Sequence, residues 1–188
     1  MNNSIKILPI ISLILFCYST QMFPQAPDTM WTKTFGGTSI DIGHCVQQTA
    51  DSGYIITGYT RSYGTISGRN VWLVKTDKYG NYQWNNTFGG NSDDEGYSVQ
   101  QTTDGGYIIS GYTESFGAGL NDVFLIKADA SGNQLWTKTF GGAQDDEGYS
   151  VLQTNDGSFL IGGVTSSYGA GSRDMWMIKT DPAGNLVW

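Results

Sequence analysis

A stretch of 52 residues decides the fold: residues 84–135 read WNNTFGGNSDDEGYSVQQTTDGGYIISGYTESFGAGLNDVFLIKADASGNQL. The following residues, 136–187, align with this stretch without a gap and are identical to it at 29 of 52 positions. Residues 31–83 form a third copy, with one additional residue in the loop around Thr65 to Asn70. Repetition at a fixed period of this length is typical of architectures in which each repeat is one supersecondary unit.

Each repeat contains four strand-like stretches separated by turn residues. In the second repeat we expect strands at about residues 96–102, 106–113, 123–128 and 134–140. Asp104-Gly105 supplies the positive φ of a tight hairpin between the first two, and residues 129–133 (DASGN) favour a turn between the last two. The stretch YIISGYT is β-branched and aromatic, and VFLIK is the apolar run of a strand covered on both faces. No sustained helical period occurs after the N-terminal segment.

Four short strands in about 50 residues match the size of one β-propeller blade. The sequence therefore predicts an all-β fold of four-stranded antiparallel blades over residues 31–188, with repeats 31–83, 84–135 and 136–187. We expect Trp31–Phe35 to form an outer fourth strand with no blade before it. Three blades leave a ring incomplete, because closed propellers use four to eight. Two interpretations stay open: the chain is a fragment with further blades in the same protein, or a homo-oligomer closes the ring.

Composition and charge narrow the class of protein further. The chain has 26 Gly in 188 residues and only 14% charged residues, which excludes a coiled coil and argues against disorder. Ten Lys and Arg against 17 Asp and Glu give a net charge of −7. Nucleic acid is therefore not an expected partner, because binding to phosphates requires a basic patch.

The first 26 residues read as a secretory signal peptide. Lys6 precedes an apolar run, Ile7 to Phe16, that is too short to span a bilayer, and we expect cleavage between residues 20 and 26. The mature protein is then secreted or held at the cell surface, with the periplasm as the alternative compartment. It would have no transmembrane span. Cys45 would be its single cysteine, which rules out an intramolecular disulfide.

The repeated phrases carry a resemblance to a known family. WTKTFGG, WNNTFGG, TDGGYIISGYTESFG and DVFLIKADASGN resemble the β-propeller repeats of secreted, multi-bladed bacterial surface proteins. Those repeats are akin to the seven-bladed propeller type and, more distantly, to kelch repeats. The resemblance covers Trp31 to Trp188. It implies a propeller fold and export, and it implies no activity, because such repeats serve as scaffolds.

Acidic residues follow the Gly-Gly pair of each repeat and form the first group of candidate site residues. Because Ca²⁺ takes carboxylate and carbonyl oxygens, the triplets are a candidate calcium site. The alternative, which the sequence favours, is structural: the middle Asp caps its loop by accepting backbone N–H bonds. The triplets are Asp93-Asp94-Glu95 and Asp145-Asp146-Glu147, and the middle position is occupied in all three repeats, by Asp41, Asp94 and Asp146.

Aromatic residues form the second group of candidates. Tyr63, Phe116 and Tyr168 stand in Ser- and Gly-rich loops, which suits contact with a sugar or peptide ligand or, alternatively, packing between blades. The repeated Trp31, Trp84 and Trp136 are interpreted as packing between blades. Two further repeated sets are interpreted as turn caps and strand ends: Asn70, Asp122 and Asp174, and Lys75, Lys127 and Lys179.

Catalytic motifs and cofactor sites are not evident after the signal peptide, and near-identical repeats argue against a single asymmetric active site. The sequence therefore predicts a non-enzymatic binding module that presents repeated loops to a glycan or protein ligand, with no cofactor; calcium at the acidic triplets stays an open alternative. Two alternatives stay open. The chain could belong to an exported glycan-active enzyme whose catalytic residues lie in other blades, or to a structural spacer.

Overall fold

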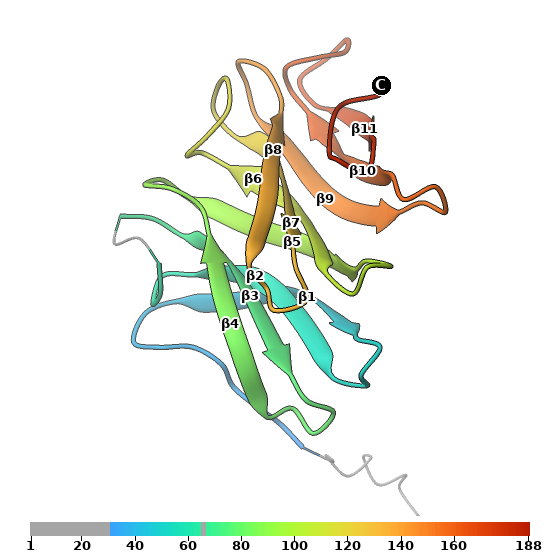
Figure 1. Ribbon diagram of the computed structural model, residues 1–188. Helices are drawn as coiled ribbons and strands as arrows, with labels where there is room; N and C mark the ends of the chain where they lie inside the picture. The colour runs from blue at the N-terminus through green and yellow to red at the C-terminus, as the bar shows by residue number, and fades with distance from the viewer. Residues whose placement is uncertain (1–30, 65–66) are drawn as a thin grey trace, which may run out of the picture. The chain divides into compact units, whose positions relative to one another are not determined.

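The computed structural model describes residues 31–64 and 67–188, so the predicted signal peptide lies outside the described residues. Residues Trp31–Trp188 form one compact unit. The described residues contain no helix, and therefore none that is long and apolar enough to cross a membrane. Eleven strands form three antiparallel sheets (Figure 1), which confirms the predicted all-β class.

The three sheets repeat one meander. Sheet 1 has the order β1-β2-β3-β4, sheet 2 the order β5-β6-β7-β8, and sheet 3 the order β11-β10-β9. Sheet 1 comprises β1 (Asp41–Gln48), β2 (Tyr54–Thr60), β3 (Asn70–Thr76) and β4 (Tyr82–Phe88). Sheet 2 comprises β5 (Asp94–Gln101), β6 (Tyr107–Thr113), β7 (Asp122–Ala128) and β8 (Gln134–Phe140). Sheet 3 comprises β9 (Asp146–Gln153), β10 (Phe159–Thr165) and β11 (Asp174–Thr180).

Turn chemistry sets the strand ends where the sequence predicted them. Thr102 N–H donates to the Gly106 carbonyl at 2.9 Å, with Gly105 at φ +83° in the hairpin between β5 and β6. Between β7 and β8, Asp129 Oδ1 accepts the N–H groups of Ser131 at 2.9 Å and Asn133 at 2.8 Å. These side-chain bonds close the turn locally, so each strand begins within two residues of its expected position.

Two apolar layers join the sheets face to face. In the first junction, Val71 and Leu73 of sheet 1 belong to one buried cluster with Ile109 and Phe124 of sheet 2. The second junction buries Ile108, Val123 and Leu125 of sheet 2 against Val151, Phe159, Ile161 and Ile178 of sheet 3. Strands β3 and β7 are buried along their whole length, because neighbours cover both faces, as the apolar runs predicted.

The two ends of this array differ from the sequence expectation. Trp31–Phe35 was predicted as a strand, but the structure assigns none there, because no described strand lies beside it to form a ladder. At the other end, Thr180 and Leu186 form a single isolated bridge instead of a fourth strand in sheet 3. A strand needs a hydrogen-bonded neighbour, and both of these segments lie at the edge of the repeat array.

Candidate functional site

Each Phe-Gly-Gly loop is held by the aspartate that follows it. Asp146 Oδ2 accepts the Gly142 N–H at 2.8 Å and the Ser167 hydroxyl at 2.6 Å, while Oδ1 accepts the Thr165 hydroxyl. Burial raises the pKa of Asp146, but these hydrogen bonds outweigh it and hold the pKa below its ordinary value. The other two repeats use Asp41 with Gly37 and Ser62, and Asp94 with Gly90 and Ser115. These contacts are the capping role that the sequence favoured for the middle aspartates.

The same network fixes the aromatic residue beside the serine. Thr165 Oγ1 accepts the Tyr168 N–H at 3.1 Å, and the Tyr168 hydroxyl donates to the Gly141 carbonyl at 2.8 Å. The Tyr168 ring packs on Trp176 of its own sheet, with the ring centroids 5.4 Å apart. The corresponding pairs in sheets 1 and 2 are Tyr63–Trp72 at 5.6 Å and Phe116–Phe124 at 5.8 Å.

These three rings are partly accessible to solvent. Tyr63, Phe116 and Tyr168 are 41%, 48% and 52% exposed, so none of them is buried, although the Tyr168 hydroxyl bonds the Gly141 carbonyl that follows β8 of the neighbouring sheet. Each sits at the same place on its sheet, beside Ser and Gly backbone groups, and its backbone is fixed by the same threonine contact. The structure thus presents one aromatic contact three times, on a rigid frame.

The acidic triplets are not brought together as a cation site. In the first triplet, Asp93 pairs with Arg69 at 3.4 Å and Asp94 is buried in its capping role. Glu95 instead accepts from Arg69, the Tyr112 hydroxyl and His44. Within the described residues no group of three or more acidic, His or Cys side chains converges as a metal site. The suggestion of calcium at Asp93-Asp94-Glu95 is therefore not supported, because Asp93 and Glu95 both pair with Arg69 and Asp94 is engaged as the loop cap.

The second triplet is divided in the same way. Asp145 Oδ1 accepts the Asn121 N–H at 3.3 Å, Asp146 is the cap, and Glu147 accepts from the Tyr149 hydroxyl at 2.7 Å and pairs with Arg173 at 3.2 Å. The structure consequently gives no calcium site at Asp145-Asp146-Glu147 either. A cavity of about 390 Å³ lies beside Asp145. Its lining residues are Ser92, Glu114, Gly119, Leu120, Asn121 and Asp145.

Sequence reasoning missed a repeated ion pair. Lys75 is only 4% exposed, and its ammonium lies 2.9 Å from Asp51 in the turn between β1 and β2. Hydrogen bonds from Thr49 and Lys75 lower the pKa of Asp51 to about 2. Lys127 repeats this contact with Asp104 at 2.9 Å. The sequence alone indicates only that the lysines stand at strand ends and that the Asp-Gly turn forms a hairpin. Their joint recurrence in every repeat was the available evidence that they pair.

The aspartates before each third strand do cap turns. Asp122 Oδ2 accepts the Ala118 N–H at 2.9 Å, and Asp174 Oδ2 accepts the Ala170 N–H at 3.0 Å. Burial, with a smaller contribution from the charge of Asp146, raises the pKa of Asp122. The carboxylates of Asp122 and Asp146 both lie close to Gly141. A Cβ at this glycine would be 2.0 Å from Asp122 Oδ1 and 2.8 Å from Asp146 Oδ2.

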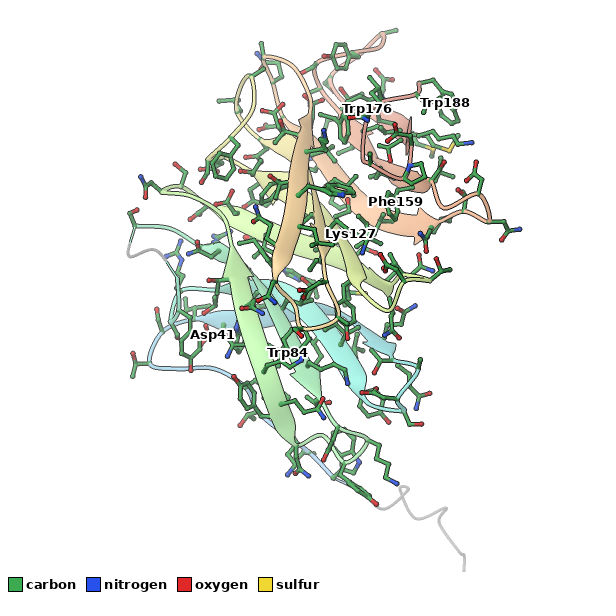
Figure 2. The ribbon with its side chains drawn as sticks, viewed as in Figure 1. Asp41, Trp84, Lys127, Phe159, Trp176 and Trp188 are labelled. Carbon is green, nitrogen blue, oxygen red and sulfur yellow. The ribbon has the colours of Figure 1, made fainter. Side chains whose placement is uncertain are left out.

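The repeated tryptophans pack between sheets, as the sequence predicted. The Trp84 ring lies 5.8 Å from Tyr107 and the Trp136 ring 5.9 Å from Phe159, each contact joining one sheet to the next. Figure 2 shows Trp84 on β4 and Phe159 in sheet 3. Trp31 makes the same contact with Tyr54 at 5.9 Å. Trp31 thus holds the place of an outer-strand tryptophan, although no sheet accompanies it.

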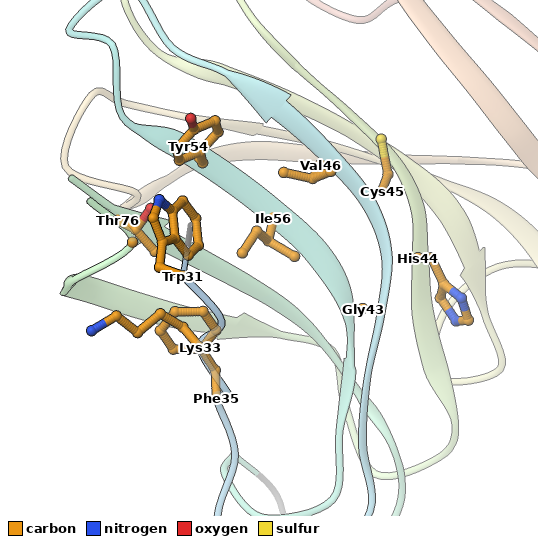
Figure 3. A pocket seen from close by; sticks show the side chains of 11 residues that line it. Trp31, Lys33, Phe35, Gly43, His44, Cys45, Val46, Tyr54, Ile56 and Thr76 are labelled. Atoms are coloured by element: carbon orange, nitrogen blue, oxygen red, sulfur yellow. The ribbon is translucent and has the colours of Figure 1, made fainter. Parts of the chain in front are cut away.

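A groove of about 500 Å³ opens beside Trp31 on the free face of sheet 1 (Figure 3). Trp31, Lys33 and Phe35 form one side, and residues 43–46 of β1 form the other. Tyr54 and Ile56 of β2 also line it. The lining is mostly apolar and carries no set of convergent polar groups of the kind that orient a small substrate.

Comparison with known proteins adds little to this geometry. No protein family model matches the chain. Regulatory protein FlaEY of Caulobacter vibrioides is 27% identical to it over 154 residues, a match that covers 74% of this chain and 16% of that protein. The chain therefore spans about a sixth of the length of this curated relative.

Proposed function

We propose that the chain is part of an exported, non-enzymatic β-propeller that binds glycans at the cell surface or outside the cell. The observation that carries this proposal is the half-exposed aromatic ring that recurs at the same loop position of all three sheets. Aromatic faces suit sugar rings, because they offer a large rigid contact area at little conformational cost.

Repetition of the sheets favours the propeller arrangement. Each sheet is an antiparallel meander of three or four strands, and the two junctions use equivalent residues. Meanders stacked by the same two faces are the building pattern of a propeller. Equivalent loops would then lie on one rim of the ring, and contacts that are weak individually would add by multivalency along an extended ligand.

Equivalence of the loops also favours binding over catalysis. A catalytic site requires one asymmetric constellation of nucleophile, acid and base, held in a defined mutual geometry. Here each loop offers an aromatic ring at the same position and the same serine, whose hydroxyl is already engaged by the capping aspartate. The export part of the proposal rests on the N-terminal sequence, Lys6 followed by an apolar run.

A glycan array tests this function. We expect the purified chain to bind a subset of extended glycans, and the triple variant Tyr63→Ala, Phe116→Ala, Tyr168→Ala to lose that binding. Tyr79→Ala is the matched control, because Tyr79 is a 60% exposed aromatic outside these loops, in the turn between β3 and β4. Binding that survives the triple substitution would refute the loop mechanism, and silence on all glycans together with capture of a protein ligand would refute the glycan assignment.

A further inference from the structure

We infer that the two free sheet faces are complementary and bind each other in trans, so that sheet 3 of one copy docks on sheet 1 of a second copy. This inference rests on the propeller arrangement proposed above. The internal junctions supply its pattern, because the same pair of faces meets twice within the chain. Among the described residues, sheet 3 leaves one face of this pair uncovered, and sheet 1 leaves the other face uncovered.

Sheet 3 exposes the half that sheets 1 and 2 bury. Met175 and Met177 stand where sheet 2 has Val123 and Leu125, which are 1% and 0% exposed. In sheet 3 the two methionines are 95% and 53% exposed. Side chains of this size on a sheet face are usually covered, and flexible methionines adapt well to an apolar partner.

Sheet 1 exposes the other half. Val46 and Ile56 occupy the positions that Val99 and Ile109 hold in sheet 2, where both are buried in the first junction. Val46 is 62% exposed, and both residues line the groove of Figure 3. Trp31 already contacts this face as Trp84 contacts sheet 2. The groove therefore lies where the inner strands of a preceding sheet would pack.

Docking would also complete a sheet. In sheet 2, Val123 pairs with Phe140 and Phe124 pairs with Thr139 across β7 and β8. By the same register, Phe35 and Thr34 of the second copy would pair with Met175 and Trp176, which have no outer partner among the described residues. Trp188, bonded to Lys179, occupies the place that Trp31 would take, so it would be displaced.

Charge at the two ends suits this contact. In the first internal junction Arg69 of sheet 1 pairs with Asp93 and Glu95 of sheet 2. Sheet 1 has Ile40 and Ile42 in place of those two acids, and they are 55% and 40% exposed. On sheet 3 the counterpart of Arg69 is Arg173, which pairs with Glu147 of its own sheet at 3.2 Å. Docking would therefore not bury an unpaired charge at this position.

Head-to-tail docking has a defined stoichiometry. Such a contact is heterologous, and it forms a ring if the rotation closes and a filament if it does not. Two copies of residues 31–188 supply six sheets, which is within the four to eight of closed propellers, whereas three copies exceed that range. We therefore expect residues 31–188 to form a closed dimer with two identical junctions.

Light scattering coupled to size exclusion tests the inference over about 1 to 100 μM protein, the range of moderate affinities. The chain should run as a dimer at the upper end. Met175→Asp and Val46→Asp should each give a folded monomer, because each destroys one half of both junctions. An equimolar mixture of the two variants should regain dimers. In a mixed dimer, one of the two junctions joins the unchanged sheet 3 of the Val46 variant to the unchanged sheet 1 of the Met175 variant.

Controls make the outcomes decisive. Leu135→Asp, at a 57% exposed site on β8 of the middle sheet, should leave the dimer intact, and circular dichroism should show that all variants are folded. A monomer at every concentration would overturn the inference. So would a dimer that survives either single variant, since that points to a symmetric contact. Glycan binding measured on the same samples separates this result from the proposed function, which a monomer can retain.

Discussion

The two sheet junctions share an apolar layer but differ in the charged groups above it. Between sheets 1 and 2, Arg61 and Arg69 pair with Asp93, and Arg69 also reaches the buried Glu95. Between sheets 2 and 3, the equivalents of the two arginines are Glu114 and Asn121, so among the described residues no basic side chain of sheet 2 pairs with Asp145, and only the charge of Arg173 of sheet 3 acts on it. The comparison shows that apolar packing and the loop caps are common to both junctions. The charged side chains above the apolar layer differ between the junctions, and the architecture is the same.

Truncation of the shared apolar layer should have the largest effect and should not distinguish the junctions. Leu73 and Leu125 hold equivalent positions in the two clusters, and both are 0% exposed. Leu73→Ala and Leu125→Ala should each lower the free energy of unfolding by about 2 to 5 kcal/mol, through lost burial and a residual cavity. Urea denaturation measures both. Costs that differ by more than about 2 kcal/mol would show that the layers are not equivalent.

Removal of the arginine should distinguish the junctions sharply. Arg69→Met leaves Glu95, whose side chain is 6% exposed, without its guanidinium partner. We expect a loss of roughly 2 to 4 kcal/mol at neutral pH, because an unpaired buried carboxylate is costly. The matched variant Asn121→Met in the second junction should cost less than about 1 kcal/mol. Equal losses for the two variants in thermal unfolding would contradict the distinction.

A smaller effect should follow from the carboxylate pair at Gly141. Burial and Asp146 raise the pKa of Asp122, so its ionised form opposes folding above that pKa, and the penalty disappears as the pH falls through it. Asp122→Asn copies sheet 1, where Asn70 holds this position. The variant should gain roughly 0.5 to 1 kcal/mol at pH 7. The gain should shrink toward acidic pH. A variant that is less stable than the parent at pH 7 would show that the anion is needed as a cap.

The smallest expected effect is a gain in stability when the arginine of the first junction is introduced at the equivalent position of the second. Asn121→Arg would place a guanidinium near Asp145 and Glu147, as Arg69 lies near their counterparts in the first junction. A partly exposed pair of this kind contributes about 0.2 to 1 kcal/mol, and salt reduces it. Thermal melts at low and high salt measure this gain. A melting temperature unchanged at low salt would show that the charged contacts of the first junction depend on more than the arginine.

Sequence reasoning located the fold well because local chemistry repeats. Asp-Gly turns and the apolar run at residues 123–128 placed strands to within two residues, and the shared Asp94 indicated a loop cap. It predicted that the repeated tryptophans pack between sheets, but it could not place the polar contacts that join different repeats. The reach of Arg69 to Glu95 depends on how neighbouring sheets pack, and the isolated state of Trp31–Phe35 depends on a missing neighbour. Neither is encoded within one repeat.

Titration calorimetry with a glycan that binds on the array is the most direct test of the central claim, that three equivalent loops share the binding. We expect Tyr63→Ala, Phe116→Ala and Tyr168→Ala each to weaken binding by a similar factor of about 2 to 10, as one aromatic contact is worth. Combined variants should multiply these factors. Loss of all binding in one single variant, with no change in the other two, would reveal one asymmetric site and contradict the account.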